Sequence, residues 1–134
     1  MTTIDCATEK PNAYPISVRL REHSFHADVG PSSGGEDTAP GPHDYFDAAL
    51  ATCKALTAMW YAKKNGIALE RVESHVESDA TEERNGKYVL RVRLTFHGPL
   101  SDDDKKRVYA AVAKCPVHKL MTTTDVVIET APLA

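Results

Sequence analysis

The sequence predicts an α+β fold in which a long central helix is covered by strands grouped in hairpins. The first observation is an apolar segment, Pro42 to Gly66, that can form a helix of roughly 23 residues, or about 35 Å. The second is the alternation of apolar and polar residues on both sides of this segment, which is typical of half-buried strands. The expected order of elements is β-β-α-β-β-α-β, without the parallel winding of βαβ units.

The residues before the central helix predict one hairpin and a surface loop. Residues 1–14 show no sustained period and are expected to form a loose N-terminal arm of a single domain that spans residues 1–134. Apolar residues alternate from Ile16 to Leu20 and from Phe25 to Val29, which predicts two strands whose connecting tip lies near Arg21. The glycine-rich residues 30–41 predict a loop that shapes the rim of a pocket.

The central helix carries signals at both ends. Pro42 suits a first helical position, and Asp44 and Asp47 place negative charge near the positive end of the helix dipole. At the far end, Asn65-Gly66 supplies residues that tolerate the left-handed conformation of a C-terminal cap. These signals predict where the helix begins and ends.

Cys53 lies near the middle of this helix, and we expect its side chain to be packed. It falls in an apolar stripe with i, i+3, i+4 spacing that includes Phe46, Leu50 and Trp60, and Lys54 is the one charge among its near neighbours. Because apolar residues extend well beyond this stripe, the helix must be covered on several sides. A chain of 134 residues has little apolar surface to spare for this, and a second copy would supply the missing cover.

The chain after the central helix predicts a second hairpin, a helix and a short last strand. Alternation runs over residues 72–80 and 88–97, with Asn85-Gly86 as a strong turn signal between them. Ser101 and Asp104 resemble a capping box that opens a second helix, and Cys115 closes its apolar stripe. Pro116 begins a further helical turn with Cys115 at its N-cap, and residues 125–130 are expected to form the terminal strand.

Composition and charge argue against several classes of protein. The net charge of −3, from 16 basic and 19 acidic residues that are interspersed, provides no basic surface for nucleic acid or for an anionic membrane. Neither a secretory signal nor a membrane span is recognisable, so we expect a soluble cytoplasmic protein. No glycine-rich phosphate-binding motif occurs, and no cofactor is expected.

Three distant cysteines favour reduced thiols over a secreted disulfide framework, and the two helical ones admit several interpretations. As buried apolar residues they would have no chemical role. As a redox pair, one thiol would be oxidised and the other would form a disulfide with it. Cys115 lies at a helix N-terminus, which predicts the more acidic thiol, whereas Cys53 would need Arg21 or Arg19 to lower its pKa.

A zinc site is the third interpretation of these cysteines. Cys53, Cys115 and His118 could supply three ligands, but a structural zinc site normally has four, and no metal is expected. His75 and His97 lie on the polar faces of their strands and are predicted to be solvated surface histidines.

Two longer motifs resemble those of a known family. The residues GGEDTAPGPHDYFDAALATC resemble the pattern GGxDTGPxPxxxxLxALxxC at the start of the central helix in the OsmC/Ohr family, and KCPVHKLM resembles its second cysteine motif. The similarity runs from about His23 to Glu129, with matching element order. The CPVH residues are similar to the OsmC-like branch rather than to the founding hydroperoxide resistance enzymes.

This resemblance implies an intertwined homodimer in which two long central helices are wrapped by sheets from both chains. It also implies a thiol peroxidase that acts on organic hydroperoxides. In that reaction Cys53 attacks the O–O bond and becomes a sulfenic acid, and Cys115 resolves it to a disulfide that a dithiol, lipoyl-type in better studied members, then reduces. The activating arginine of the family corresponds to Arg21, with Arg19 as the second choice.

The resemblance also implies a set of substrate-binding residues and leaves an alternative function. The strongest peroxidases of the family carry a glutamate ten residues before the first cysteine, where this chain has His43 followed by Asp44. The expected substrate-binding residues are His43, Asp44, Phe46, Leu50 and Trp60. Because the glutamate is replaced, the alternative is a dimeric protein of the same fold that binds small apolar molecules with little or no peroxidase activity.

Overall fold

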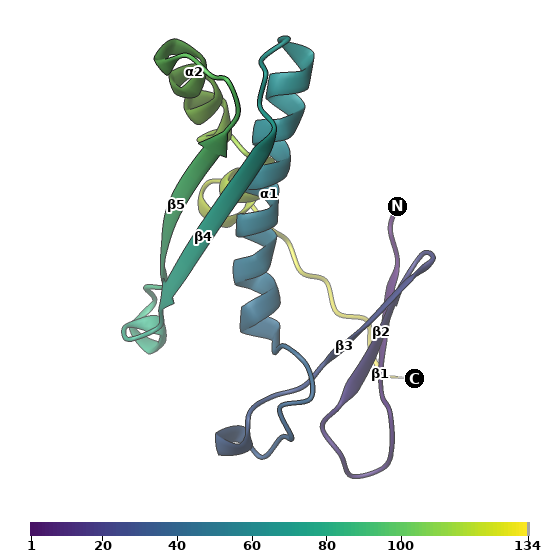
Figure 1. Cartoon of the computed structure of the whole chain (residues 1–134). Coiled ribbons are helices and arrows are strands. Elements are labelled where there is room, and N and C mark those ends of the chain that lie inside the picture. Colours follow the sequence, from purple (N-terminus) through teal and green to yellow (C-terminus); the bar gives the residue numbers. More distant parts are fainter. Residues whose placement is uncertain (134) are drawn as a thin grey trace. The chain divides into compact units, whose positions relative to one another are not determined.

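A computed structural model of the chain describes residues 1–133 (Figure 1). As predicted, these residues form an α+β fold, with two antiparallel sheets and a long helix between them in the sequence. The chain divides into two compact units, Met1–Phe46 and the part from Asp47 onward, and a single domain over residues 1–134 stays a prediction. Among the described residues, no helix combines the length and the apolar character needed to cross a bilayer.

The first unit is built on a sheet with the order β1-β2-β3, formed by β1 (Ile4–Thr8), β2 (Ile16–Leu20) and β3 (His23–Ala27). The predicted hairpin is confirmed, with Arg21 in its turn at a φ of 52°. Residues 1–14 are not a loose arm throughout, because β1 pairs with β2 along its whole length. All residues of β1 are exposed, so main-chain pairing forms this strand and no apolar period reveals it.

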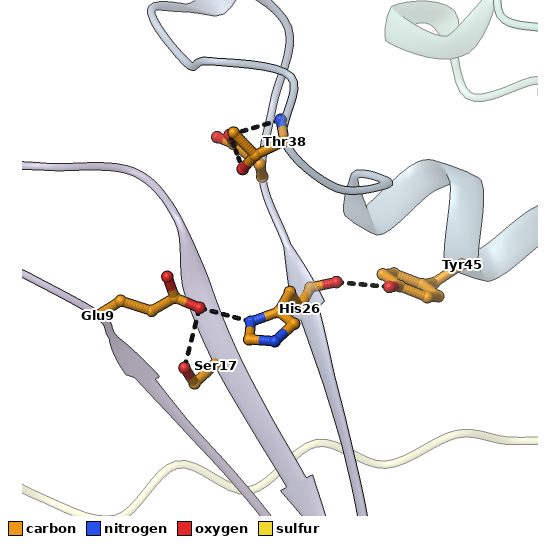
Figure 2. Close-up of polar contacts among 6 residues, drawn as sticks. Glu9, Ser17, His26, Thr38 and Tyr45 are labelled. Atoms are coloured by element: carbon orange, nitrogen blue, oxygen red, sulfur yellow. Dashed lines mark hydrogen bonds and ion pairs between the residues drawn. The ribbon is translucent and has the colours of Figure 1, made fainter.

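Side chains connect the strands of this sheet to one another and to the next helix (Figure 2). Glu9 accepts a hydrogen bond from the Ser17 hydroxyl at 3.0 Å and pairs with the ring of His26. Its hydrogen bond with His26, followed by that from Ser17, lowers the pKa of the Glu9 carboxyl. The Tyr45 hydroxyl donates a hydrogen bond to the carbonyl of His26. The centroid of the Tyr45 ring lies 5.2 Å from that of the Phe25 ring. The first turn of the following helix is thereby attached to β3.

The loop after β3 is organised by the buried carboxylate of Asp28. Its oxygens accept hydrogen bonds from the N–H groups of Val29 and Thr38 at 2.7 and 3.0 Å, and from the Thr38 hydroxyl at 2.7 Å. These bonds, that of the Thr38 N–H first, hold the pKa of Asp28 below its ordinary value. The loop contains a short 3₁₀ helix, η1 (Pro31–Ser33), and most of its residues are exposed, as predicted.

The central helix α1 (Pro42–Lys64) has the 23 residues predicted for it. The Asp44 carboxylate accepts a hydrogen bond from the N–H of Gly41 at 2.8 Å, which is the return half of a capping box. Beyond the far end, Gly66 adopts a φ of 65°, in agreement with the predicted cap. Both ends of the helix are therefore confirmed.

The packed face of α1 differs from the predicted stripe around Cys53. The buried residues of the helix are spaced by four: Leu50, Lys54, Ala58 and Ala62. Of the predicted stripe, Cys53 is half-buried, and Phe46 and Trp60 are 47% and 60% exposed. Since apolar residues surround most of this helix, the helical period alone does not identify the face that packs.

The second unit contains most of α1, the hairpin of β4 (Arg71–Asp79) and β5 (Val89–His97), and the helices α2 (Asp102–Val112) and α3 (Pro116–Thr122) (Figure 1). The predicted hairpin is confirmed, and its connection holds the 3₁₀ helix η2 (Glu83–Asn85). Ser101 caps α2 by accepting from the N–H of Asp104 at 3.0 Å, as predicted. The buried core of this unit comprises Ala58, Ala62, Ile67, Leu69, Val108 and Val112.

Apolar side chains of the β4–β5 hairpin pack against this core, and two further features fix the hairpin in the unit. The Tyr88 hydroxyl donates to the Asp47 carboxylate at 2.7 Å, and burial raises the pKa of the Tyr88 phenol. Directly after β5, Gly98 has a φ of 138°, and a Cβ at this position would lie 2.4 Å from the carbonyl oxygen of Ala68. The end of β5 can approach the segment that contains Ala68, just before β4, so closely because residue 98 is glycine.

The expected terminal strand over residues 125–130 is wrong. The structure forms no strand there, and Val126, Val127 and Ile128 are exposed. A strand needs a neighbour for its N–H and C=O groups, and no strand of residues 1–133 pairs with this segment. The last regular element is α3, which begins at Pro116 with Cys115 as its N-cap, as predicted. The order over the described residues is therefore β-β-β-α-β-β-α-α.

Candidate functional site

The two helical cysteines differ in their access to solvent. Cys53 lies on α1 and is half-buried, with its Sγ 3.9 Å from the hydroxyl of Thr57, one turn further along. Cys115 forms the junction between α2 and α3 and is fully buried. The two thiols are close enough to interact, since the side chain of Cys53 contributes to raising the pKa of Cys115. The third cysteine, Cys6, is exposed on β1 in the first unit.

An open groove runs along Cys53. Its volume is ≈ 1030 Å³, and its walls combine one face of α1 with residues of α2 and the start of α3. Leu56 and Trp60 line it beside Cys53, and two cationic side chains, Arg107 and Lys114, are also part of the lining. The buried cysteine of the pair does not line the groove. A molecule in the groove therefore reaches the thiol of Cys53 first.

A buried cation lies close to the cysteine pair but is not part of the groove lining. Lys54 follows Cys53 on α1 but belongs to the packed face, where it is only 5% exposed. Its Nζ donates a hydrogen bond to the carbonyl oxygen of Val112 at 3.2 Å and lies 2.8 Å from Nδ1 of His118. An ammonium group has only donors, so we assign Nδ1 as the acceptor. Lys54 thus connects α1 to Val112 and His118, which lie three residues before and three residues after Cys115 in the sequence.

Opposing influences act on the ionisation of Cys115. Burial is the largest and raises the pKa of its thiol, whereas the N–H of His118 and the charge of Lys54 lower it. The net effect is a raised pKa. The expectation that the helix dipole makes Cys115 an acidic thiol is therefore wrong. The N–H of His118, in the first turn of the seven-residue helix α3, favours the thiolate, but this effect does not offset the lost hydration.

The other predicted site residues are distributed over both units. Five of them are exposed and belong to the first unit: Arg19, Arg21, His43, Asp44 and Phe46. In the second unit, Trp60 lines the groove beside Cys53, whereas Leu50 lies on the packed face of α1. Roles for the two arginines and for the first turn of α1 in the chemistry of Cys53 stay predictions.

The zinc interpretation finds no matching ligand set. Among residues 1–133, no three histidine, cysteine or carboxylate side chains are grouped so that they could hold a metal ion. The Nδ1 atom of His118 is hydrogen-bonded to Lys54 instead. His75 and His97 are exposed and contact glutamate side chains of the same hairpin, which confirms them as surface histidines.

Sequence reasoning missed Lys54 as part of the site and considered His118 only as a zinc ligand. Lys54 stands out in the sequence as the one charge within the apolar part of the central helix. Its spacing of four from Leu50 and Ala58 is the signal that places it on the packed face. A lone charge on a packed face needs partners, and these could not be located without the tertiary structure.

The model of the OsmC-like protein family matches residues 34–131, well over half of the chain. A search of curated proteins finds no significant match.

Solved structures with the same fold include an OsmC-like protein from Mycoplasma pneumoniae, with a TM-score of 0.72, 20% identity, and coverage of 92% of this chain and 88% of that one. A protein from Psychrobacter arcticus named for osmotic stress induction and detoxification response has a TM-score of 0.76, 20% identity and coverage of 92% and 90%. The organic hydroperoxide resistance protein OsmC from Legionella pneumophila has a TM-score of 0.64, 22% identity and coverage of 92% and 90%. These likenesses establish the fold, and the family model establishes that the chain belongs to the OsmC-like protein family.

Proposed function

We propose that this protein is a thiol peroxidase that reduces organic hydroperoxides. The observation that carries the proposal is a half-buried cysteine, Cys53, on the wall of an apolar groove, with a fully buried cysteine, Cys115, next to it. Family membership supports it, as does the fold shared with a Legionella protein named for organic hydroperoxide resistance.

The reaction begins at Cys53 because the groove gives access to this thiol and not to Cys115. The Cys53 thiolate attacks the O–O bond, takes one oxygen as a sulfenic acid, and the organic part leaves as an alkoxide that gains a proton and becomes an alcohol. The Cys115 thiol then displaces this oxygen, which leaves as water, and a Cys53–Cys115 disulfide is formed. Two thiols are oxidised for each peroxide reduced.

The groove supports an organic substrate rather than a small polar one. Leu56 and Trp60 present apolar surface beside the thiol, and such surface is typical of sites for molecules with a hydrocarbon part. The Thr57 hydroxyl, 3.9 Å from Sγ, can donate to the thiolate. Arg21, or in second place Arg19, would supply the positive charge that activates Cys53, and His43 with Asp44 would take the place of the family glutamate.

The disulfide is reduced by an external dithiol, of the lipoyl type or similar. The dithiol attacks Cys53 through the groove, since the sulfur of Cys115 is buried. We place the protein in the cytoplasm, where the reducing poise keeps its cysteines as thiols.

The functional form is a homodimer in which a second copy packs against the apolar face of α1 and leaves the thiol of Cys53 accessible through the groove. Leu56 and Trp60 are 69% and 60% exposed within one chain, which is unusual for large apolar side chains on the same helix face. Light scattering after gel filtration should give twice the mass of one chain. A monomer at micromolar concentration would contradict this part of the proposal.

The peroxidase proposal is tested by following an organic hydroperoxide, such as cumene hydroperoxide, in the presence of the reduced protein and dihydrolipoamide. Cys53→Ser should abolish peroxide loss, whereas Cys6→Ser, which removes an exposed cysteine of the first unit, should leave it unchanged. Peptide mapping after one turnover should find the Cys53–Cys115 disulfide. Equal rates for the wild type and Cys53→Ser would reject the assignment of Cys53.

The second candidate function is the binding of a small apolar molecule with little catalysis. It is favoured by the volume and apolar walls of the groove, and by His43 at the position of the family glutamate. Titration of the Cys53 thiol by alkylation separates the two functions. A thiol that reacts only with an ordinary cysteine pKa, together with saturable binding of an apolar fluorescent probe, would support the binding function.

A further inference from the structure

We propose that Lys54 is a positioning residue for Cys115: its ammonium group fixes the α2–α3 junction against α1 and stabilises the Cys115 thiolate when the disulfide forms and when it is reduced. This inference rests on the proposed function, because it takes the Cys53–Cys115 disulfide as the intermediate. It adds a third participant to the site, a residue that does not line the groove.

The hydrogen bonds of Lys54 have the geometry of a clamp. One goes to the carbonyl of Val112, at the end of α2, and the other to the ring of His118, in the first turn of α3. Cys115 is midway between these two residues in the sequence. Because Lys54 is the residue next to Cys53 on α1, a single side chain holds the two cysteine-bearing segments together.

The same ammonium group retains a third N–H donor beyond these two bonds. Its charge also acts on the sulfur of Cys115 and favours the thiolate. His118 and Cys53 are the other groups that influence this sulfur, and neither is a fixed cation. Lys54 therefore supplies the positive charge of this buried corner.

The chemistry requires such a charge because both disulfide steps pass through the Cys115 thiolate, and this sulfur is buried away from water. In the oxidising direction, Cys115 loses its proton and forms the S–S bond to Cys53, and the departing hydroxide takes up a proton to become water. In the reducing direction, the dithiol bonds to Cys53, the S–S bond breaks, and Cys115 leaves as a thiolate. The attack of Cys53 on the peroxide involves neither step, so Lys54 should affect the disulfide steps selectively.

A titration tests the inference without any peroxide. The full chain carrying Cys6→Ser and Cys53→Ser has Cys115 as its only thiol, whose thiolate is followed by ultraviolet absorbance against the same protein with Cys115→Ser. Adding Lys54→Met should move the midpoint of this titration upward by roughly one pH unit or more, because an opposite charge at short range is removed. Lys63→Met, at an exposed position of the same helix, should leave the curve unchanged.

A second measurement separates the disulfide steps from the attack on the peroxide. In the otherwise wild-type chain, Lys54→Met should accumulate Cys53 sulfenic acid, trapped by dimedone, while its first turnover of peroxide proceeds at the wild-type rate. His118→Ala, which removes one partner of Lys54 at an exposed site, should give a smaller effect in the same direction.

Superimposable titration curves with and without Lys54→Met would overturn the inference, whether or not the protein consumes peroxide. Absence of peroxide loss in the wild type would instead reject the proposed function and leave the titration result valid. If Lys54→Met does not fold, the His118→Ala titration decides, and an unchanged curve there would also overturn the inference.

Discussion

Replacement of Lys54 by methionine is expected to leave the protein about as stable as before, although it removes a buried side chain with two hydrogen bonds. A hydrogen bond from a charged donor contributes about 1.5–3 kcal/mol, so the loss of two costs about 3–6 kcal/mol. Against this, burying the ammonium group costs several kcal/mol of lost hydration. Methionine is unbranched and of similar length, but it carries no charge and avoids this cost. The free energy of unfolding should change by no more than about 1.5 kcal/mol.

The two effects nearly cancel because neither partner of Lys54 is left unsatisfied. The Val112 carbonyl still accepts a hydrogen bond from the N–H of Cys115 at 3.1 Å. The ring of His118 is exposed and can bind water in place of the ammonium group. A buried partner without any remaining bond would add a penalty of about 1–3 kcal/mol, and this penalty is avoided here.

Unfolding of the reduced protein by increasing urea, at one fixed protein concentration, measures this change in the free energy of unfolding. Lys63→Met serves as the matched control at an exposed position of α1. Val108→Ala, in the fully buried core, is the positive control and should lose about 2–3 kcal/mol through lost transfer energy and a new cavity. A loss above about 1.5 kcal/mol for Lys54→Met would mean that its hydrogen bonds outweigh its desolvation, and would refute the reasoning.

Three further predictions concern contacts outside the cysteine pair. Tyr88→Phe removes the 2.7 Å hydrogen bond to Asp47 and should cost about 1–2 kcal/mol by urea unfolding; no loss would mean that water replaces the bond fully. Gly98→Ala places a Cβ against the main-chain carbonyl of Ala68 and should lower the free energy of unfolding by more than about 2 kcal/mol. Gly86→Ala, which has open space around it, should lose only about 1 kcal/mol through backbone strain. Equal losses for the two variants would contradict the close approach at Gly98. The pKa of Asp28 is lowered on folding, so its contribution to stability is present above its ordinary pKa of 3.8 and is lost as the pH falls through the folded pKa. The difference in unfolding free energy between the wild type and Asp28→Asn should therefore become smaller as the pH is lowered. A difference that is constant across pH would contradict this.

Local signals predicted those parts of the fold that depend on neighbouring residues. Pro42 and Asp44 mark the start of α1 because a helix terminus is stabilised by groups within one turn of it. The strands β4 and β5 follow from their period of two, since one face packs and the other is solvated. In each case the information lies within a few residues of the feature.

Features that depend on distant residues were not predictable in the same way. The strand β1 has both faces exposed, so its formation depends on pairing with β2 and leaves no pattern of burial. Residues 125–130 have strand-forming side chains, but a strand forms only where another edge is available. The acidity expected for Cys115 failed because burial, a tertiary property, exceeds the effect of a short helix.

The position of Lys54 joins these two kinds of information. Consecutive residues of an α-helix project about 100° apart, so Cys53 and Lys54 necessarily face different surroundings although they are adjacent in the sequence. Cys53 lines the groove, where a substrate and a reductant can reach it, and Lys54 reaches the junction that carries Cys115. From the sequence alone, Lys54 is only the one charged residue in the apolar part of a helix. The fold adds the reason, because the segment held by that charge carries the second cysteine.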